Sequence, residues 1–322
     1  MFAPIVWQRH ELLYGYSGAV VAGFLLTVVP KWTGREPLSG AALGALVVLW
    51  FAGRVVIFFP GPLGPLGPLA VAAIDLAFLV VLLAWIGREL VLAGNRRNLG
   101  VLVVGLFALG NAVFHREAAL GGTAVLGSRF DIATLLLLIL VVAGRIVPAF
   151  TRNWFIRRES AHRPAAFGVL DAATIAVSVL ALGSWVHAAR LTPPTIVFAA
   201  LLALAATLNL WRLARWHGHR TFADPLVAAL HVAYAFVPAG FAAMALAVAA
   251  PGQVPGAVVV HLWTIGAERT PRRRGRTREC GALSGGSCGW ADDTPSSLGY
   301  RYAERSMRQG GARMGEMDPR YV

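Results

Sequence analysis

Long apolar segments alternate with short polar ones along most of this chain. Eight of the apolar segments are long enough to cross a bilayer, because about 20 apolar residues span the hydrocarbon core as a helix. They cover residues 12–30, 41–59, 68–93, 99–114, 131–150, 167–188, 194–213 and 225–250. A ninth begins near Val254 and ends at Ala267, which is too short to cross. The pattern predicts an all-α, polytopic transmembrane helical bundle with eight full spans and an incomplete ninth.

Composition supports a membrane location and explains the high net charge. Hydrophobic residues make up 57% of the chain and charged residues 14%, whereas a soluble domain carries about 25% charged residues. The formal net charge of +13 resembles that of a nucleic-acid-binding protein. The basic residues of the apolar part, however, lie mostly between the apolar segments, as in the cytoplasmic loops of membrane proteins. We therefore expect the lipid bilayer, and no nucleic acid, as a partner.

Loop charge also predicts the orientation of the chain. The first, third, fifth and seventh loops together hold 12 Lys and Arg residues, and the loops between them hold 3. An excess of Lys and Arg marks the cytoplasmic side. The amino terminus is therefore expected outside.

Five histidines fall within or beside the apolar segments, and they are the residues most suited to chemistry. With the predicted orientation, four lie toward the outer side: His10, His115, His187 and His261. His231 lies about two turns into its span from the cytoplasmic side. Ionisable residues in a bilayer are costly and usually functional, and neutral imidazole binds haem iron and copper. Four outer histidines would suffice for one haem, with one or two left for copper. The alternative is hydrogen bonding between helices, which spacing alone does not exclude.

Other charged residues in the apolar segments are candidate partners of these histidines. Glu11, beside His10, and Arg54 are candidates because a ligating histidine usually donates its other ring nitrogen to an acceptor. Asp75 and Asp171 could pair with arginines or relay protons, although the position of Asp171 at the start of its span favours an interfacial residue. Arg145 lies deep enough to need a partner such as a haem propionate, which a guanidinium suits; alternatively its long stem reaches the headgroup level.

The stretch RHELLYGYSGAVVAGFLLTVVPKWTGR, followed by LWFAGR, closely resembles the opening of the NnrS family. These are polytopic bacterial membrane proteins associated with haem, copper and the response to nitric oxide. Further matching segments are NAVFHRE, GRIVPAFTRNW, LHVAYAFVPAG and HLWTIGA, which contain His115, Arg145, His231 and His261.

The resemblance implies a bacterial inner-membrane haem b protein, with copper as a further metal. Nitric oxide or a related small molecule would be its partner, in nitrosative-stress physiology and alongside denitrification. It supports ligand roles for His10, His115, His231 and His261, and less so for His187. Which histidine takes iron and which takes copper stays open, as do the reaction and the oligomeric state.

The resemblance covers residues 1–267, which form the predicted membrane domain. Residues 268–322 contain 11 arginines and no apolar run, so they cannot complete the ninth span. One interpretation is a genuine basic tail that contacts anionic lipid. The other is translation in a shifted reading frame of a GC-rich gene, which would leave the domain truncated at its carboxyl end. The break falls in the middle of an apolar helix and favours the second. We expect this tail to be disordered.

Two other classes of function compete with the haem protein of the nitric oxide response. A membrane electron-transfer cytochrome needs two histidines that face each other at one depth, and His231 stands alone on its side. A cofactor-free transporter would show paired acidic residues or broken helices at mid-membrane. Asp75 is the one carboxylate of the apolar part expected far inside.

Overall fold

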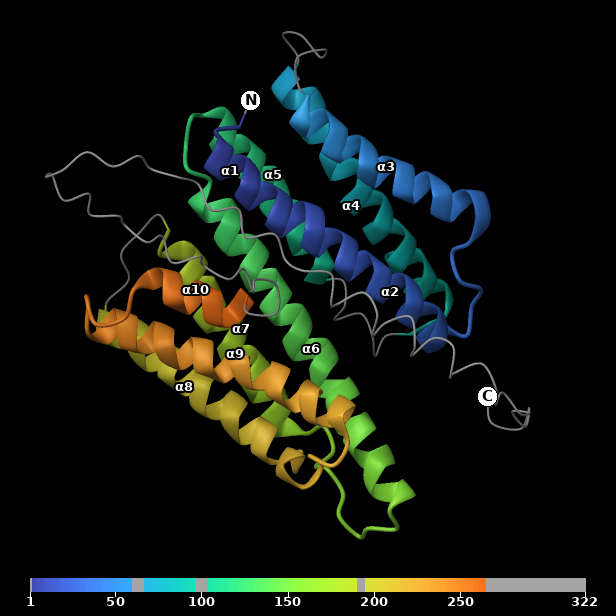
Figure 1. The fold of residues 1–322 in the computed structure, drawn as a ribbon, viewed down its shortest axis with the longest axis vertical. Helices are drawn as coiled ribbons and strands as arrows, with labels where there is room; N and C mark the ends of the chain where they lie inside the picture. The colour runs from blue at the N-terminus through green and yellow to red at the C-terminus, as the bar shows by residue number, and fades with distance from the viewer. Residues whose placement is uncertain (1, 60–66, 96–102, 190–194, 265–322) are drawn as a thin grey trace, which may run out of the picture. The chain divides into compact units, whose positions relative to one another are not determined.

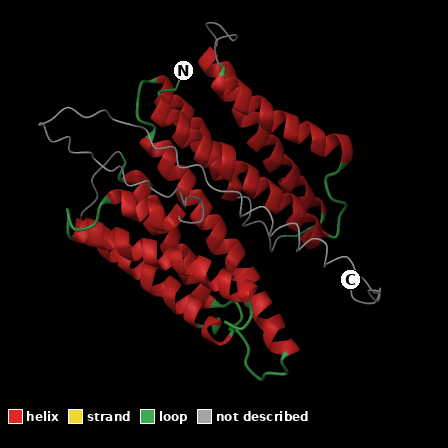
Figure 2. Cartoon of the chain, in the orientation of Figure 1, coloured by secondary structure: helices red, strands yellow, loops and turns green. Residues whose placement is uncertain are grey.

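The protein is described here from a computed structural model, which describes residues 2–59, 67–95, 103–189 and 195–264 (Figure 1). Within these ranges every regular element is a helix (Figure 2). Most helices that follow one another in the sequence also pack against one another. The prediction of an all-α bundle is confirmed. The tail from residue 268 and most of the Pro/Gly-rich connector Pro60–Pro68 lie outside the described residues.

The first helix is continuous over Pro4–Thr33. It consists of α1 (Pro4–His10), a π-helical stretch η1 (Glu11–Tyr16) and α2 (Ser17–Thr33). Proline at the first helical position has no amide hydrogen to leave unpaired. The helix ends at Gly34, whose φ of +66° suits glycine and whose amide bonds the Pro30 carbonyl at 2.8 Å.

The predicted start of this span at residue 12 was wrong. The helix begins eight residues earlier, so His10 and Glu11 lie inside it and not before it. The sequence signal was the apolar run alone, and polar residues that face the protein interior interrupt such a run without ending a helix.

Three helices follow the first one: α3 (Gly40–Phe58), α4 (Gly67–Leu92) and α5 (Val104–Ala119). The last of these continues five residues beyond the predicted end at residue 114, so His115 is helical. Residues 96–102, where the predicted span begins, lie outside the described part.

The rest of the described chain forms five further helices and a short 3₁₀ turn. They are α6 (Val125–Arg157), α7 (Val169–His187), α8 (Thr195–Ala214), η4 (Gly218–Arg220), α9 (Pro225–Ala249) and α10 (Gly256–Thr264). The longest is α6, with 33 residues, which extends well beyond the predicted limits 131–150 at both ends. Asp224 caps α9 by accepting hydrogen bonds from two amides of its first turn.

Seven of the described helices are long and apolar enough to cross a membrane. They correspond to seven of the eight predicted spans; the eighth, α5, has 16 described residues. Large apolar side chains of α3 face outward, among them Val47, Val48, Phe51 and Val55, where lipid rather than water would receive them. The protein is a multi-pass membrane protein.

A buried polar network joins four of the later helices. Arg212 of α8 is fully buried and donates through Nε to Oδ1 of Asp171 on α7 at 2.8 Å. Its Nη1 donates to the Leu140 carbonyl of α6 at 3.0 Å and to the Tyr234 hydroxyl of α9 at 3.3 Å. Tyr234 in turn donates to Asn209 at 2.8 Å. The favoured interpretation of Asp171 as an interfacial residue was wrong, because it is buried and pairs with Arg212.

Candidate metal centre

Three buried side chains from three helices meet near the start of the first helix. They are His10 of α1, Asp75 of α4 and His115 of α5, named here the His–Asp–His cluster. The Nε2 atoms of His10 and His115 lie 3.2 Å and 3.0 Å from the same oxygen, Oδ2 of Asp75. The ligand atoms of all three lie within 4.8 Å of one another. In the described part of the chain, this is the one group of three or more such residues with that spacing.

Asn111 connects the two histidines and the carboxylate. It lies one helical turn before His115, on the same face of α5. Its Nδ2 donates to Oδ2 of Asp75 at 2.7 Å, and its Oδ1 lies 3.0 Å from Nε2 of His10. Asn111 is 1% exposed, so these contacts are shielded from water.

Glu11 and Arg54 form a second layer around the cluster. Oε1 of Glu11 lies 3.3 Å from Nδ1 of His10. Arg54 donates through Nη1 to both oxygens of Glu11, at 3.0 Å and 3.1 Å, and pairs through Nη2 with Asp75. A side chain on Gly15 would collide with this guanidinium. The predictions that Glu11 and Arg54 act beside His10, and that Asp75 pairs with an arginine, agree with these contacts.

Aromatic rings enclose the cluster. The rings of Phe2, Tyr14 and Phe114 lie 5.4 Å, 5.3 Å and 5.1 Å from the His10 ring. Tyr14 is held in place because its hydroxyl donates to the Gly127 carbonyl at 2.6 Å. Three aromatic rings thus surround His10, and the ring of Phe2 also lies 5.5 Å from that of His115.

The π-helical stretch η1 begins at Glu11, directly after His10. Its wider turn leaves carbonyls without their ordinary partner, and Ser17 donates to the Leu12 carbonyl at 3.1 Å. Single π turns within helices occur mostly at functional sites. Here the stretch sets the directions of His10, Glu11 and Tyr14.

The charges and the hydrogen bonds of the cluster would both be balanced by one more positive charge. Glu11 and Asp75 carry two negative charges and Arg54 one positive charge. His10 has an acceptor at each ring nitrogen, whereas a neutral imidazole has one N–H to donate. A second proton or a metal ion would satisfy both conditions.

The donor set fits a first-row transition metal. Two imidazole nitrogens and one carboxylate oxygen are ligands that iron, copper and zinc accept. Atoms bound about 2.0–2.1 Å from one ion lie roughly 3.0–3.4 Å apart, which includes the observed separations of 3.0 Å and 3.2 Å from Asp75 Oδ2. Glu11 on the far nitrogen of His10 supplies the outer contact that ligating histidines usually have.

The other predicted site residues lie outside this cluster. His231 is buried on α9, where its Nδ1 lies 2.8 Å from the Val227 carbonyl and its Nε2 3.4 Å from the Thr151 hydroxyl. His187 is exposed at the end of α7, and His261 is an exposed residue of α10 that lines a cavity. Arg145 is partly buried on α6.

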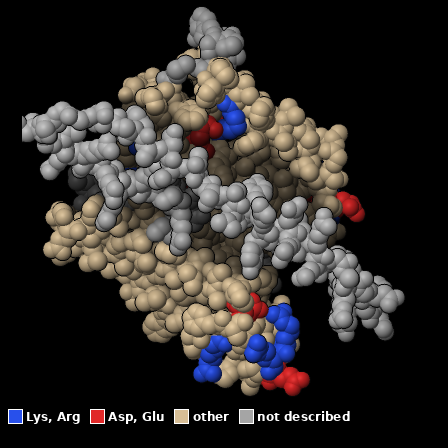
Figure 3. All heavy atoms as spheres, viewed as in Figure 1, with Lys and Arg blue, Asp and Glu red and all other residues tan. Residues whose placement is uncertain are grey.

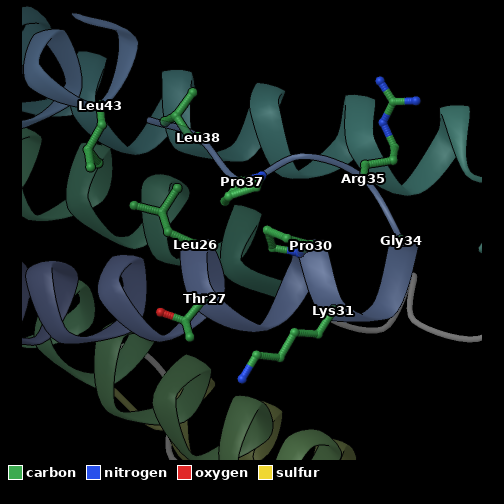
Figure 4. A pocket seen from close by; sticks show the side chains of 9 residues that line it. All are labelled: Leu26, Thr27, Pro30, Lys31, Gly34, Arg35, Pro37, Leu38 and Leu43. Atoms are coloured by element: carbon green, nitrogen blue, oxygen red, sulfur yellow. The ribbon is translucent and has the colours of Figure 1, made fainter. Parts of the chain in front are cut away.

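A second hollow lies at the turn between α2 and α3 (Figure 4). Its volume is about 610 Å³, and Leu26, Pro37 and Leu38 form part of its wall. Figure 4 shows the side chains of Lys31 and Arg35 pointing in different directions, so they do not converge on a common ligand. The His–Asp–His cluster is the better candidate site.

Two polar residues of the interior were not predicted as site residues. Asn111 could have been found from its spacing of four residues to His115, which places both on one helix face. Asp131 is fully buried on α6, but in the sequence it opens an apolar run and reads as an interfacial residue.

Comparison with known proteins assigns the chain to a family. No curated protein and no solved structure matches the chain. The family described as NnrS protein matches residues 1–270, which is most of the chain and all of its described helices. The chain therefore belongs to the NnrS family.

Proposed function

We propose that this protein holds a transition metal ion, copper in the first place, at the His–Asp–His cluster. The observation that carries the proposal is His10, which has a carboxylate at each ring nitrogen inside a cluster that lacks one positive charge. His115 and Asp75 supply the other two ligand atoms, and Arg54 keeps the carboxylates in position. The family resemblance supports copper, and imidazole is a ligand that suits it.

We infer that the protein acts in the response to nitric oxide, alongside denitrification. A bound copper or iron ion would supply an open coordination position to which nitric oxide can bind. Phe2, Tyr14 and Phe114 would keep water away from that position. Nitric oxide is small and apolar and dissolves in the bilayer, so a site buried among helices is open to it.

Haem b is the second cofactor that we propose. The His–Asp–His cluster is proposed for the single metal ion, so we place the haem elsewhere in the chain. Its candidate ligands are His261 and His231, and His187 and Arg145 are further candidates for contacts with it. The arrangement favours His261, which lines a cavity, over His231, which Thr151 and a neighbouring Gly218 enclose.

We further propose the bacterial inner membrane as the location, with the amino terminus outside. Figure 3 shows Lys and Arg side chains gathered near the end of α6, and an excess of such residues marks the cytoplasmic side. Single cysteines at Ala161 and Gly121, in a chain without Cys280 and Cys288, would test this. An impermeant thiol reagent added to intact cells should label position 121 and spare 161; the reverse pattern contradicts the orientation.

Metal analysis of the purified protein tests the function. We expect one copper ion per chain in the unaltered protein and, in the electron paramagnetic resonance spectrum, splitting from two nitrogens. His10→Gln and His115→Gln keep the side-chain bulk but remove a ligand, so copper affinity should fall by a factor of at least about ten, as it does when even an outer contact is lost.

His187→Gln is the matched control, because His187 is exposed and lies outside the cluster. It should keep the full copper content. A content unchanged in both His10→Gln and His115→Gln would overturn the proposal for this cluster. A Soret band in the oxidised and reduced spectra tests the haem separately.

A cofactor-free transporter is the second candidate, and two observations favour it. The first helix carries a π-helical stretch next to the buried polar residues, and Asp75 and Asp131 are both buried in the bundle. Irregular helices and buried carboxylates are typical of ion pathways. A purified protein with neither bound metal nor a Soret band would favour this class. A metal-bound protein without haem would weigh against both the transporter and the electron-transfer cytochrome.

A further inference from the structure

A large cavity lies between the first helix and the helices α6 to α10. Its volume is about 590 Å³, within the roughly 300–1,000 Å³ of ordinary cofactor sites. The wall is mainly apolar and includes Leu13, Ile132, Trp185, Phe198, Met244 and Val260. A molecule with a large apolar body would be held here by burial of its surface.

Three basic side chains also line this cavity: Arg9, Arg129 and His261. Nη1 of Arg9 donates to the Thr123 carbonyl at 2.6 Å, and Nη1 of Arg129 donates to the Trp185 carbonyl at 2.7 Å. A guanidinium has five N–H donors, so each arginine keeps several for a ligand while its position is fixed.

The charge of the cavity selects the kind of ligand. Among the described residues that line it there is no carboxylate, so Arg9 and Arg129 lack an acidic partner within the wall. A ligand with two acid groups would balance them, because guanidinium binds carboxylate through paired hydrogen bonds. An uncharged ring such as a quinone would leave both charges without a counterion.

His261 adds a ligand for a metal. His261 is on α10, which Trp263 fixes against α9. The ring nitrogen of Trp263 donates to the Val237 carbonyl at 3.4 Å, and the Trp263 ring lies 5.1 Å from that of Trp185. An imidazole at the wall of an apolar cavity is the usual axial ligand of haem iron.

The cavity and the His–Asp–His cluster are lined by different residues of the first helix. Arg9, Leu12 and Leu13 line the cavity, whereas His10 and the adjoining Glu11 belong to the cluster and its second layer. One helix, about 10 Å thick, is thus a wall of both.

We propose that this cavity is the haem site of the protein, with His261 on the iron and Arg9 and Arg129 on the two propionates. The inference rests on the proposed function only in that it requires haem. It assigns the propionates to Arg9 and Arg129 and not to Arg145, the residue expected from the sequence. Arg145 lies about 24 Å further along α6 than Arg129, at 1.5 Å per residue.

Titration of the purified, full-length protein with hemin tests the site. Binding should produce a Soret band and quench the fluorescence of Trp185, measured as the difference from Trp185→Phe. His261→Gln should shift the Soret band and lose the axial nitrogen signal, and added imidazole should restore both. Arg9→Gln and Arg129→Gln should each weaken binding about tenfold, as expected for loss of a charged hydrogen bond.

Metal-free protoporphyrin separates the two contributions. It carries both carboxylates but no iron, so its binding should depend on Arg9 and Arg129 and be unaffected by His261→Gln. Its dimethyl ester lacks the negative charges and should bind at least about tenfold more weakly. Equal affinity for the acid and the ester would overturn the role of the arginines.

His231→Gln is the matched control, since His231 is buried elsewhere on α9. A hemin spectrum lost in His231→Gln and unchanged in His261→Gln would overturn this inference while leaving haem in the protein. No hemin binding by the unaltered chain would overturn both the inference and the haem part of the proposed function. Quinone binding that depends on Arg129, without hemin binding, would likewise overturn it.

Discussion

His10 and His115 point their Nε2 atoms at one oxygen of Asp75, with their rings 5.1 Å apart and inclined at 66°. The two histidines and the aspartate whose oxygen they share come from three different helices, α1, α4 and α5. Small shifts of any one helix therefore alter the geometry of the whole cluster.

Replacing Arg54 should destabilise the protein in a way that a metal ion reverses. Arg54→Met leaves Glu11 and Asp75 without their shared cation, and loss of one partner of a buried ion pair costs about 3–5 kcal/mol. The thermal unfolding midpoint in detergent should fall, and added Cu²⁺ should restore part of the loss. Arg88→Met, at an arginine 63% exposed beside Glu89, should change it little.

Replacing Asn111 should weaken metal binding without removing a ligand. Asn111→Leu keeps the side-chain volume but removes the contacts to His10 and Asp75. Loss of such an outer contact lowers metal affinity roughly 10–100-fold, which copper competition with a chelator would measure. Asn209→Leu, in the polar network of Arg212, should reduce stability and keep copper affinity; equal copper affinity in both variants would contradict the prediction.

Gly127 should be required for the position of His115, although it supplies no ligand atom. A methyl group on Gly127 would lie 2.6 Å from the backbone of Phe114 on α5. Gly127→Ala should therefore push α5 from α6, cost about 1–3 kcal/mol as overpacking does, and reduce copper affinity. Gly23→Ala meets nothing within 4 Å and should leave both unchanged. Unaltered copper binding in Gly127→Ala would show that α5 is positioned by other contacts.

The network of Arg212 should contribute to stability and not to metal binding. Arg212→Met leaves Asp171 with the partly exposed Arg215 as its remaining basic partner, so the cost should stay below the about 3–5 kcal/mol of a buried charge left without any partner. The double variant Asp171→Asn, Arg212→Met removes both charges and should be more stable than Arg212→Met alone, since neighbouring sites are not additive. Thermal unfolding checks the order, and copper content should stay constant in all three proteins.

Much of the bundle could be predicted from the sequence because apolar length is a direct requirement of the bilayer. Seven of the eight predicted spans, in the predicted order, are long apolar helices among the described residues. The limits of the helices could not be predicted from apolar length. The helix α6 runs six residues before and seven residues beyond its apolar segment, because polar residues at a membrane surface continue a helix as well as apolar ones.

The grouping of the histidines could be predicted only in part. Loop charge gave the depth of His10, His115, His187 and His261, and all four were expected in one outer group. Two of them meet at Asp75, whereas His261 lines the cavity beyond the first helix and His187 is exposed. Depth follows from counting residues along a span. Rotation about the helix axis is set by packing, and helices that are apolar on every side carry little sign of it.

Arg9 and His10 are consecutive residues of the first helix that face two different sites, the cavity and the His–Asp–His cluster. A turn of that helix by a single residue, about 100° at 3.6 residues per turn, would carry His10 out of the cluster and move Arg9 away from the cavity in the same motion. A rotation of the first helix cannot change the geometry of one site without changing that of the other. The rotation of the first helix about its axis therefore affects both sites. The haem absorbance and the copper electron paramagnetic resonance signal should both respond to it.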